Sequence, residues 1–487
     1  MNKILSIKKD ELSLFIPLFV IMSCIVFNTK VLKILKDTIV VTTPEMGAEL
    51  IPFLKTWLLI PISLGLICVV VRLMRVTSFL NVFFVATAFF LFIYVGYVFF
   101  ISPIQSELTP HFLINYLDAT LPYYLHKMVR IIEFWPICLF YVICDTWPII
   151  LLSMLFWKFT SVAVTHEQGK RFFPIFSIDI GGILMTPLLS LIGLVAGAYA
   201  LEGELLWKIQ LEALTLVVVA VGGIQSVVFY RLYKSTGIIN LEEEKSNKKK
   251  VPIKEVLDYA RSPFFGSLAI MIFMFEFSDN LFDVLWKDTL GNYHPEPENF
   301  SRYLGAVTTV TGVFTSIIPL VLTRFLLKNL SWSAVAIITP FLRIFLCLAF
   351  FGCLFFPELA MKMGAPFGLD ALGFTVFVGG IQSCLMQMAK CTVFDNTKDL
   401  ALMLAPKEEQ GAARAFSDAL ATKFGKSSSC LAQQGVLMSH LSLQAASPFI
   451  ACLIGVSIPL WLFSIGTASR YYRQRLTDFM TPQAEPV

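Results

Sequence analysis

Twelve long apolar runs constrain this chain more than any other feature of its sequence. A helix needs about 20 mostly apolar residues to cross a bilayer. The first run begins at Phe15, and the others lie near residues 51–73, 78–102, 131–157, 172–200, 211–233, 264–287, 304–327, 332–357, 371–404, 415–440 and 447–469. The sequence therefore predicts an all-α, polytopic membrane protein with twelve transmembrane helices, the first of them an uncleaved N-terminal helix.

The composition excludes several other classes of protein. Of the 487 residues, 56% are hydrophobic and 15% are charged, whereas soluble domains contain about 25% charged residues. The net charge of +4 is too small to indicate a nucleic-acid partner. The ten cysteines form no CxxC pair and lie mostly in apolar runs, which indicates buried thiols. We therefore expect no metal site and no bound cofactor.

Basic residues occur in alternate loops, and this pattern predicts the topology. Cytoplasmic loops of membrane proteins carry an excess of lysine and arginine. The largest basic interval spans residues 234–263. Further basic positions in alternate loops are Arg72, Arg75, Lys158, Lys170, Arg171, Arg324, Lys328, Arg470, Arg473 and Arg475. We therefore expect 234–263 to be a cytoplasmic linker, and we expect both termini, including a tail at 471–487, to be cytoplasmic.

Short motifs recur in the two halves of the sequence. The matching pairs are Lys36-Asp37-Thr38 with Lys287-Asp288-Thr289, Glu167-Gln168-Gly169 with Glu409-Gln410-Gly411, and Asp145 with Asp395. Each pair falls in the same place relative to the predicted helices. The repeat predicts two homologous six-helix halves, 1–233 and 264–470, in the layout of major-facilitator-type transporters. Such transporters bind substrate near the middle of the bilayer at the interface of their repeats.

Many charged residues fall within the predicted helices, where each costs about 2.5–3.5 kcal/mol on insertion scales and therefore suggests function. They are Lys36, Glu133, Asp145, Asp179, Glu276, Asp279, Asp283, Lys287, Arg343, Lys390, Asp395, Lys398, Asp399, Asp418, Lys423 and Lys426. The commonest explanation for any one of them is a structural ion pair. Together, however, the lysines would give a central cavity a positive potential that suits a polyanionic substrate, because lysine binds phosphate as a compact charge. Lys30 has a simpler explanation, since its side chain could snorkel to lipid headgroups.

Two apparent signs of enzymatic activity fail on inspection. Gly425-Lys426-Ser427 resembles the end of a P-loop, but Leu420 stands where the first glycine is required. No nucleophile–base pair or metal-ligand cluster is evident either. We therefore expect a transporter and not an enzyme, and a receptor or scaffold would not need duplicated buried charges.

Several segments resemble the ATP/ADP translocase (nucleotide transporter) family of plastids and obligate intracellular bacteria. They are Lys36-Asp37-Thr38-Ile39-Val40-Val41-Thr42, Gly47-Ala48-Glu49-Leu50-Ile51-Pro52-Phe53-Leu54-Lys55, Ala389-Lys390, Phe394-Asp395, Thr397-Lys398-Asp399 and Gly425-Lys426-Ser427. The resemblance extends from the first predicted helix to the eleventh. It implies a twelve-helix carrier in a bacterial inner membrane, usually importing host ATP in exchange for ADP and phosphate.

The resemblance also implies which residues act. The family's two functional lysines and two functional glutamates correspond to Lys36, Asp145, Asp283 and Lys426, so both glutamates are aspartates here. We predict that Lys36, Lys426, Lys287 and Lys390 bind the substrate phosphates. Asp145, Asp283 and Asp395 would act as counter-charges or coupling groups. Phe27, Trp57, Trp147 and Trp286 could stack on the base.

The main prediction is a nucleotide transporter that exchanges ATP for ADP by alternating access. The first alternative is proton-coupled import of nucleoside triphosphates, because some relatives work in that way. A transporter of another organic anion and a membrane-embedded enzyme are more remote alternatives. The sequence leaves open the base preference, the co-transport of phosphate or protons, and the oligomeric state.

Overall fold

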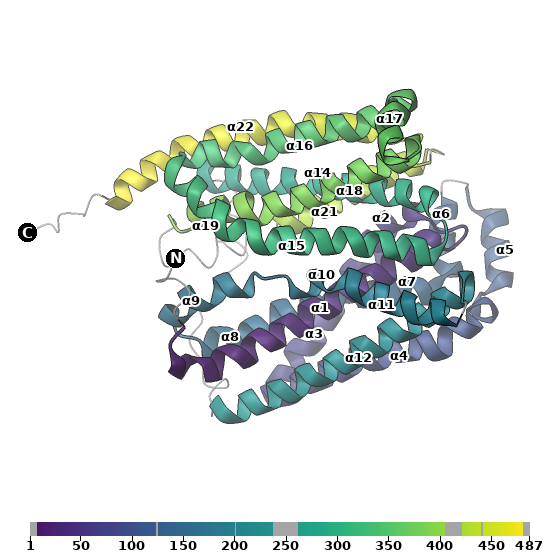
Figure 1. Cartoon of the computed structure of the whole chain (residues 1–487), viewed down its shortest axis with the longest axis horizontal. Helices are drawn as coiled ribbons and strands as arrows, with labels where there is room; N and C mark the ends of the chain where they lie inside the picture. The colour runs from purple at the N-terminus through teal and green to yellow at the C-terminus, as the bar shows by residue number, and fades with distance from the viewer. Residues whose placement is uncertain are drawn as a thin grey trace, which may run out of the picture. The chain divides into compact units, whose positions relative to one another are not determined.

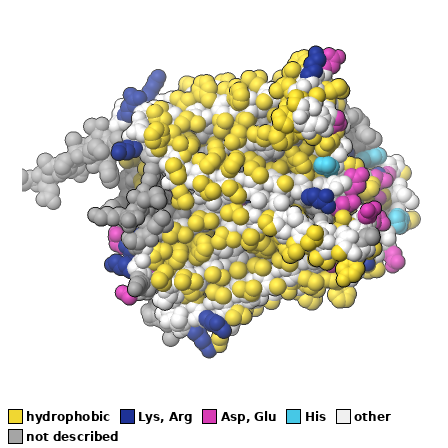
Figure 2. Space-filling view, viewed as in Figure 1, with side chains coloured by type: hydrophobic (Ala, Val, Ile, Leu, Met, Phe, Trp, Pro, Cys, Tyr) yellow, Lys and Arg dark blue, Asp and Glu magenta, His cyan; other side chains and the backbone are white. Residues whose placement is uncertain are grey.

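The computed structural model of this chain (Figure 1) describes residues 7–122, 125–199, 201–236, 262–404, 421–439 and 442–480. Within these ranges the regular structure is helical and contains no strand. The prediction of an all-α fold is therefore confirmed. The side chains on the face shown in Figure 2 are mostly hydrophobic, as expected for a surface in contact with lipid.

The chain divides by its internal contacts into two compact units. The first unit comprises Met1–Lys248 and Leu290–Ser316, and the second comprises Lys249–Thr289 and Ile317–Val487. The helices of the first unit are α1 (Leu12–Thr42), α2 (Ile51–Phe53), α3 (Leu59–Val76), α4 (Phe79–Val95), α5 (His111–Thr120), α6 (His126–Glu133), α7 (Trp135–Trp147), α8 (Trp157–Ala163), α9 (His166–Phe176), α10 (Ile180–Ile183), α11 (Met185–Ala198) and α12 (Gly203–Thr236).

Two helices cross the boundary between the units, namely α14 (Pro263–Tyr293) and α15 (Pro297–Asn329). The remaining helices belong to the second unit. They are α16 (Trp332–Phe355), α17 (Pro357–Gly364), α18 (Ala371–Ala389), α19 (Asp395–Leu402), α21 (Thr422–Leu437) and α22 (Ser447–Met480).

Ten helical segments of the described residues are long and apolar enough to cross a membrane. They are Leu12–Thr42, Ala48–Val76, Phe79–Leu108, Trp135–Ala163, Ile180–Ala198, Gly203–Thr236, Pro297–Asn329, Trp332–Phe355, Ala371–Leu402 and Ser447–Gln474. The predicted count of twelve is not confirmed, because the seventh and eleventh predicted spans are missing from this set. The seventh corresponds to α14, which has 31 residues but is interrupted by several charged side chains. The eleventh corresponds to α21, whose 16 described residues include Lys423 and Lys426. The start of this predicted span lies outside the described residues.

In the first unit, α1 packs against α7, α10 and α12. The Asn28 side-chain amide donates a hydrogen bond to the Val218 carbonyl at 3.1 Å and so ties α1 to α12. Gly181 of α10 allows an unusually close approach to α1, because a Cβ at this position would lie 2.7 Å from the Phe27 Cα. These contacts hold the middle of α1 against α10 and α12.

The first part of α15 belongs to the first unit because polar groups tie it to α10 and α11. The Thr186 and Thr309 hydroxyls lie 2.9 Å apart, and the Asp179 N–H donates to the Ser316 hydroxyl at 2.9 Å. A Cβ added to Gly312 would lie 2.7 Å from the Ile183 nitrogen. The crossing therefore depends on a small residue and on interhelical hydrogen bonds, as is common where helices pack in membranes.

Aromatic side chains from α14 and α22 form much of the core of the second unit. Phe275 stacks on Phe394 with ring centroids 4.4 Å apart, and the Trp461 ring lies edge-on to Phe275 at 5.7 Å. All three side chains are buried. Such pairs contribute about 0.5–1.5 kcal/mol each beyond the burial of their area, and they fix α14 relative to α22 and to the π-helical segment Lys390–Phe394.

Candidate functional site

Lys36 lies at the centre of a charge cluster in the first unit. Its Nζ is 3.0 Å from an Asp37 carboxylate oxygen and 3.1 Å from an Asp145 carboxylate oxygen. The ammonium also lies 3.7 Å from the centroid of the Tyr141 ring, within range of a cation–π interaction. The Lys36 and Asp37 side chains are buried, whereas Asp145 is 25% exposed. One ammonium is therefore shared by two carboxylates, and the cluster carries a net negative charge when all three groups are ionised.

The local structure of α7 explains why Tyr141 and Asp145 meet the same lysine. The two residues are four apart, so they project from the same side of the helix. Immediately beyond them, Pro148 begins a π-helical segment that extends to Phe156. Proline removes a backbone donor and clashes with the carbonyl four residues earlier, and π-helical turns are frequent at functional sites. The π-helical distortion that begins at Pro148 thus lies beside Asp145, the predicted coupling residue.

Glu276 joins two of the predicted substrate lysines in the second unit. One carboxylate oxygen lies 2.7 Å from the Lys390 Nζ, and the other lies 3.4 Å from the Lys426 Nζ. Glu276 is buried, whereas the Lys426 side chain is 54% exposed. Two ammonium groups therefore share one carboxylate, and Asp395 and Asp279 also act electrostatically on Lys390. The second lysine, Lys426, is accessible to a soluble anion.

The other predicted residues form local pairs in the second unit. Lys287 lies 2.7 Å from Asp283, one turn earlier on α14. Asp395 lies 3.7 Å from Lys398 on α19. A π-helical segment, Lys390–Phe394, directly precedes Asp395, so in both units a predicted acid lies near a π-helical segment. Lys390 also lies 5.2 Å from the centroid of the Phe275 ring.

The structure thus brings Lys36 to Asp145, Lys390 to Lys426 through Glu276, and Lys287 to Asp283. Glu276 belonged to the set of charged residues in the predicted helices, but the sequence prediction did not place it in the site. Its spacing could have revealed it. Glu276, Asp279, Asp283 and Lys287 recur at three- and four-residue intervals, which places them along one face of α14.

Two sequence interpretations need correction. Lys30 does not snorkel to lipid, because its ammonium lies 2.8 Å from Asp179, which also caps α10 by accepting a hydrogen bond from the Gly182 N–H. Glu133 is not an intramembrane charge, because it is the last residue of α6, outside the apolar segment Trp135–Ala163, and it is bonded to Arg130.

The two buried tryptophans suggested for base stacking have structural partners. The Trp147 indole N–H donates to the Ile25 carbonyl and the Trp286 N–H donates to the Val376 carbonyl, each at 3.2 Å. Both rings are at most 2% exposed. A ring that is enclosed and hydrogen-bonded in this way packs the helix bundle, and it offers no open face to a base.

The comparisons with known proteins identify the family. The family model described as the TLC ATP/ADP transporter matches residues 1–472. The chain belongs to this family. It is therefore a multi-pass membrane protein of a transporter family, and the resemblance noted in the sequence is confirmed.

Named relatives come from bacteria and plastids. The chain is 30% identical over 468 residues to ADP,ATP carrier protein 1 of Chlamydia pneumoniae, covering 94% of this chain and 91% of the relative. It is 28% identical over 466 residues to the chloroplastic ADP,ATP carrier protein 1 of Arabidopsis thaliana, covering 94% and 74%. A carrier protein from Rickettsia bellii is 27% identical over 480 residues, covering 96% and 95%.

Among solved structures, the fold is similar to that of a bacterial homologue of the iron transporter ferroportin. The TM-score is 0.51, with 14% sequence identity over 96% of this chain and 99% of that protein. At this identity the likeness concerns the fold alone.

Proposed function

We propose that this chain exchanges ATP for ADP across a bacterial inner membrane by alternating access. The observation that carries the proposal is the sharing of Glu276 by Lys390 and Lys426. Membership of the TLC ATP/ADP transporter family supports the choice of nucleotide as substrate. Lys426 is 54% exposed and shares its carboxylate with Lys390, so it can also bind an anion, and a nucleotide phosphate chain supplies several anionic oxygens.

Lys36 and Lys287 complete the proposed phosphate-binding set, and in the described structure each is paired with an acid. Charge-assisted hydrogen bonds from an ammonium to a phosphate oxygen are about as short and strong as those to a carboxylate. A phosphate can therefore replace Asp145 beside Lys36, or Asp283 beside Lys287, without leaving a buried lysine uncompensated. Asp145, Asp283 and Asp395 would then act as counter-charges that hold the lysines when no substrate is bound.

The replacement of a carboxylate by a substrate phosphate also explains why we expect exchange of nucleotides. A ligand shifts a conformational equilibrium only by the difference between its affinities for the two states. If the loaded carrier reorients readily and the empty carrier does not, net transport requires a nucleotide in both directions. Proton coupling is the alternative, in which Asp145 or Asp283 would take up a proton in each cycle.

Uptake by the purified protein in liposomes distinguishes these mechanisms. We expect uptake of labelled ATP to require internal ADP and to be unaffected by an uncoupler. Uptake that proceeds without internal nucleotide and collapses with an uncoupler would overturn exchange and support proton coupling. In that case at least one of Asp145→Asn and Asp283→Asn should lose net import while still exchanging labelled nucleotide.

We further propose that the protein consists of two homologous halves, 1–233 and 264–470, with a cytoplasmic linker at 234–263 and cytoplasmic termini. Residues 237–261 lie outside the described ones. Both α1 and α14 have 31 residues, and Lys36 and Lys287 stand at the same distance from the ends of these helices, which supports the duplication.

The topology is tested with a protease site inserted between residues 245 and 250 and, in a second protein, at the C-terminus. In right-side-out vesicles we expect both sites to be protected until the membrane is permeabilised. Cleavage of the linker site in sealed vesicles would contradict the cytoplasmic assignment. A site introduced after Thr109 serves as the control for the opposite side.

A further inference from the structure

The short helix α5 exposes large apolar side chains outside the membrane-spanning segments. Phe112 is 89% exposed, Tyr116 is 61% exposed and Leu113 is 42% exposed. The helix has 10 residues, so it is about 15 Å long and too short to cross a bilayer. It lies in the chain between the spans Phe79–Leu108 and Trp135–Ala163. Contact with lipid inside a span therefore does not account for its exposed apolar side chains.

The residues of α5 divide by character among three sides of the helix. Successive residues are about 100° apart around a helix axis, so the three exposed apolar side chains project from one side. Ile114 and Asp118 project from a second side, where Ile114 is buried and Asp118 is half-buried. His111 and Asn115 are exposed and lie on a third side. The helix thus has an apolar side, a side packed on protein and a polar side.

Ion pairs on the packed side fix the rotation of α5. The Asp118 carboxylate lies 3.4 Å from a guanidinium nitrogen of Arg130 on α6. Arg130 also lies 3.1 Å from Glu45, in the segment that joins α1 to α2. The packed side is therefore held against the rest of the first unit, and the apolar side must face away from it.

The place of α5 in the chain puts it at a boundary between membrane and water. Three spans precede it, so it lies on the side of the membrane where α1 ends, and Figure 1 shows it at that end of the first unit. Trp135 begins the next span, is 41% exposed, and donates its indole N–H to the Leu108 carbonyl at 3.3 Å. The span ends on either side of α5 are therefore at one level, and tryptophan and tyrosine are enriched at that level of a membrane.

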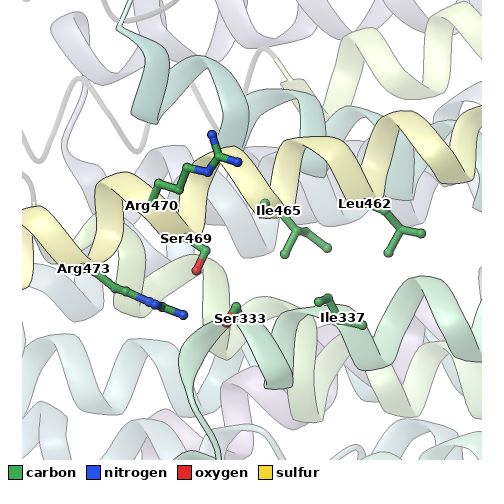
Figure 3. Close-up of a pocket in the computed structure, with 8 residues that line it drawn as sticks. Ser333, Ile337, Leu462, Ile465, Ser469, Arg470 and Arg473 are labelled. Atoms are coloured by element: carbon green, nitrogen blue, oxygen red, sulfur yellow. The ribbon is translucent and has the colours of Figure 1, made fainter.

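The surface of α5 differs from the groove of about 580 Å³ between α16 and α22 in the second unit (Figure 3). Both of those helices lie in segments that can span a membrane. Ile465 belongs to the buried core of that unit, and Ile337 packs against this core. Figure 3 shows the Arg470 guanidinium on the other side of α22 from Ser333. The groove therefore reflects the packing of two spans, whereas the apolar side of α5 is exposed.

We propose that α5 lies in the plane of the membrane interface, with Phe112, Leu113 and Tyr116 inserted among phospholipids. This contact continues the lipid-facing surface of the two neighbouring spans, and the polar side with Asn115 faces water. Short helices with one apolar and one polar side bind at the boundary of headgroups and acyl chains in this way. Through Arg130, lipid contact with α5 is connected to the segment that follows α1.

Photocrosslinking in a membrane tests this placement. Benzoylphenylalanine replaces Phe112, Tyr116 or Asn115 in separate full-length proteins, which are purified, reconstituted in liposomes of phosphatidylethanolamine and phosphatidylglycerol, and illuminated. Phe463, which is 76% exposed within the span Ser447–Gln474, provides the positive control. All four side chains are exposed, so their replacement removes no internal packing. By mass spectrometry we expect covalently added phospholipid at positions 112, 116 and 463, and its loss at position 115.

Three results would overturn the proposal. Crosslinks between two chains at position 112, in place of lipid adducts, would show that a second copy of the protein covers α5. Lipid adducts at position 463 without any at positions 112 and 116 would place the apolar side of α5 in water. Adducts at position 115 as abundant as those at position 112 would show that α5 turns no particular side toward the lipid.

Discussion

Replacing Lys36 by alanine should abolish nucleotide exchange. The ammonium lies about equally far from Asp37 and Asp145, and its removal leaves two acidic side chains without their shared cation. Breaking a buried ion pair in this way costs about 3–5 kcal/mol. The variant also loses a proposed phosphate contact, typically a factor of ten to more than a hundred in affinity. The measurement is labelled-ATP uptake into liposomes loaded with ADP, corrected for the amount of folded protein.

A double variant separates the structural role of Lys36 from its proposed role in binding. Lys36→Ala/Asp145→Asn removes the cation together with one acid, so we expect folded protein to recover toward the wild-type amount. Exchange should nevertheless remain lost, because the phosphate still lacks its lysine. Recovery of exchange in the double variant would mean that Lys36 serves only to neutralise Asp145.

Lys30 provides the matched control on the same helix. It also forms an ion pair, at 2.8 Å from Asp179, and its side chain is 24% exposed. It has no place in the proposed phosphate-binding set. We therefore expect Lys30→Ala to reduce the amount of folded protein but to leave the exchange rate per folded molecule near that of the wild type.

The fold class could be predicted from the sequence because hydrophobic length is a local property. Hydrophobic length predicts a span at 264–287, and the structure shows one continuous helix there, α14. The same criterion does not explain why Glu276, Asp279, Asp283 and Lys287 interrupt its apolar run. A charged face within a helix is tolerated when neighbouring groups in the protein compensate it, and neighbouring groups are not visible in a local window.

The residues of the candidate site could be predicted more easily than their partners. The intramembrane charges and the family resemblance both indicated Lys36 and Asp145. Their contact depends on the rotation of α1 against α7, which no sequence pattern determines. The role of Asp179 at the start of a helix could be predicted in part, because the sequence Asp179-Ile180-Gly181-Gly182 resembles a helix N-cap. That signal could have indicated the break before α10, though it would not have revealed the pair with Lys30.

Glu276→Gln should make the carrier bind ATP more tightly and turn over more slowly. The substitution keeps the shape of the side chain but removes the negative charge that Lys390 and Lys426 share. A phosphate would then no longer compete with a carboxylate for the two ammonium groups. Losing that competitor is expected to lower the Kd for ATP about tenfold or more, by the usual contribution of a charge-assisted hydrogen bond. Release of the more tightly held nucleotide becomes harder, so the maximal exchange rate should fall.

This combination of effects distinguishes a competing counter-charge from a purely structural acid. If Glu276 only held the helices together, Glu276→Gln would bind ATP with unchanged or weaker affinity.

The matched control is Asp279→Asn on the same helix, which removes an acid bonded to Arg343 and should not tighten ATP binding. Lys426→Ala should act in the opposite direction and raise the Kd, because its half-exposed ammonium is proposed to meet the phosphate directly. Binding measured by calorimetry on folded, detergent-solubilised protein, set beside exchange rates in liposomes, gives the two quantities. A lower Kd with a lower rate in Glu276→Gln is the expected result, because that carboxylate contacts both lysines.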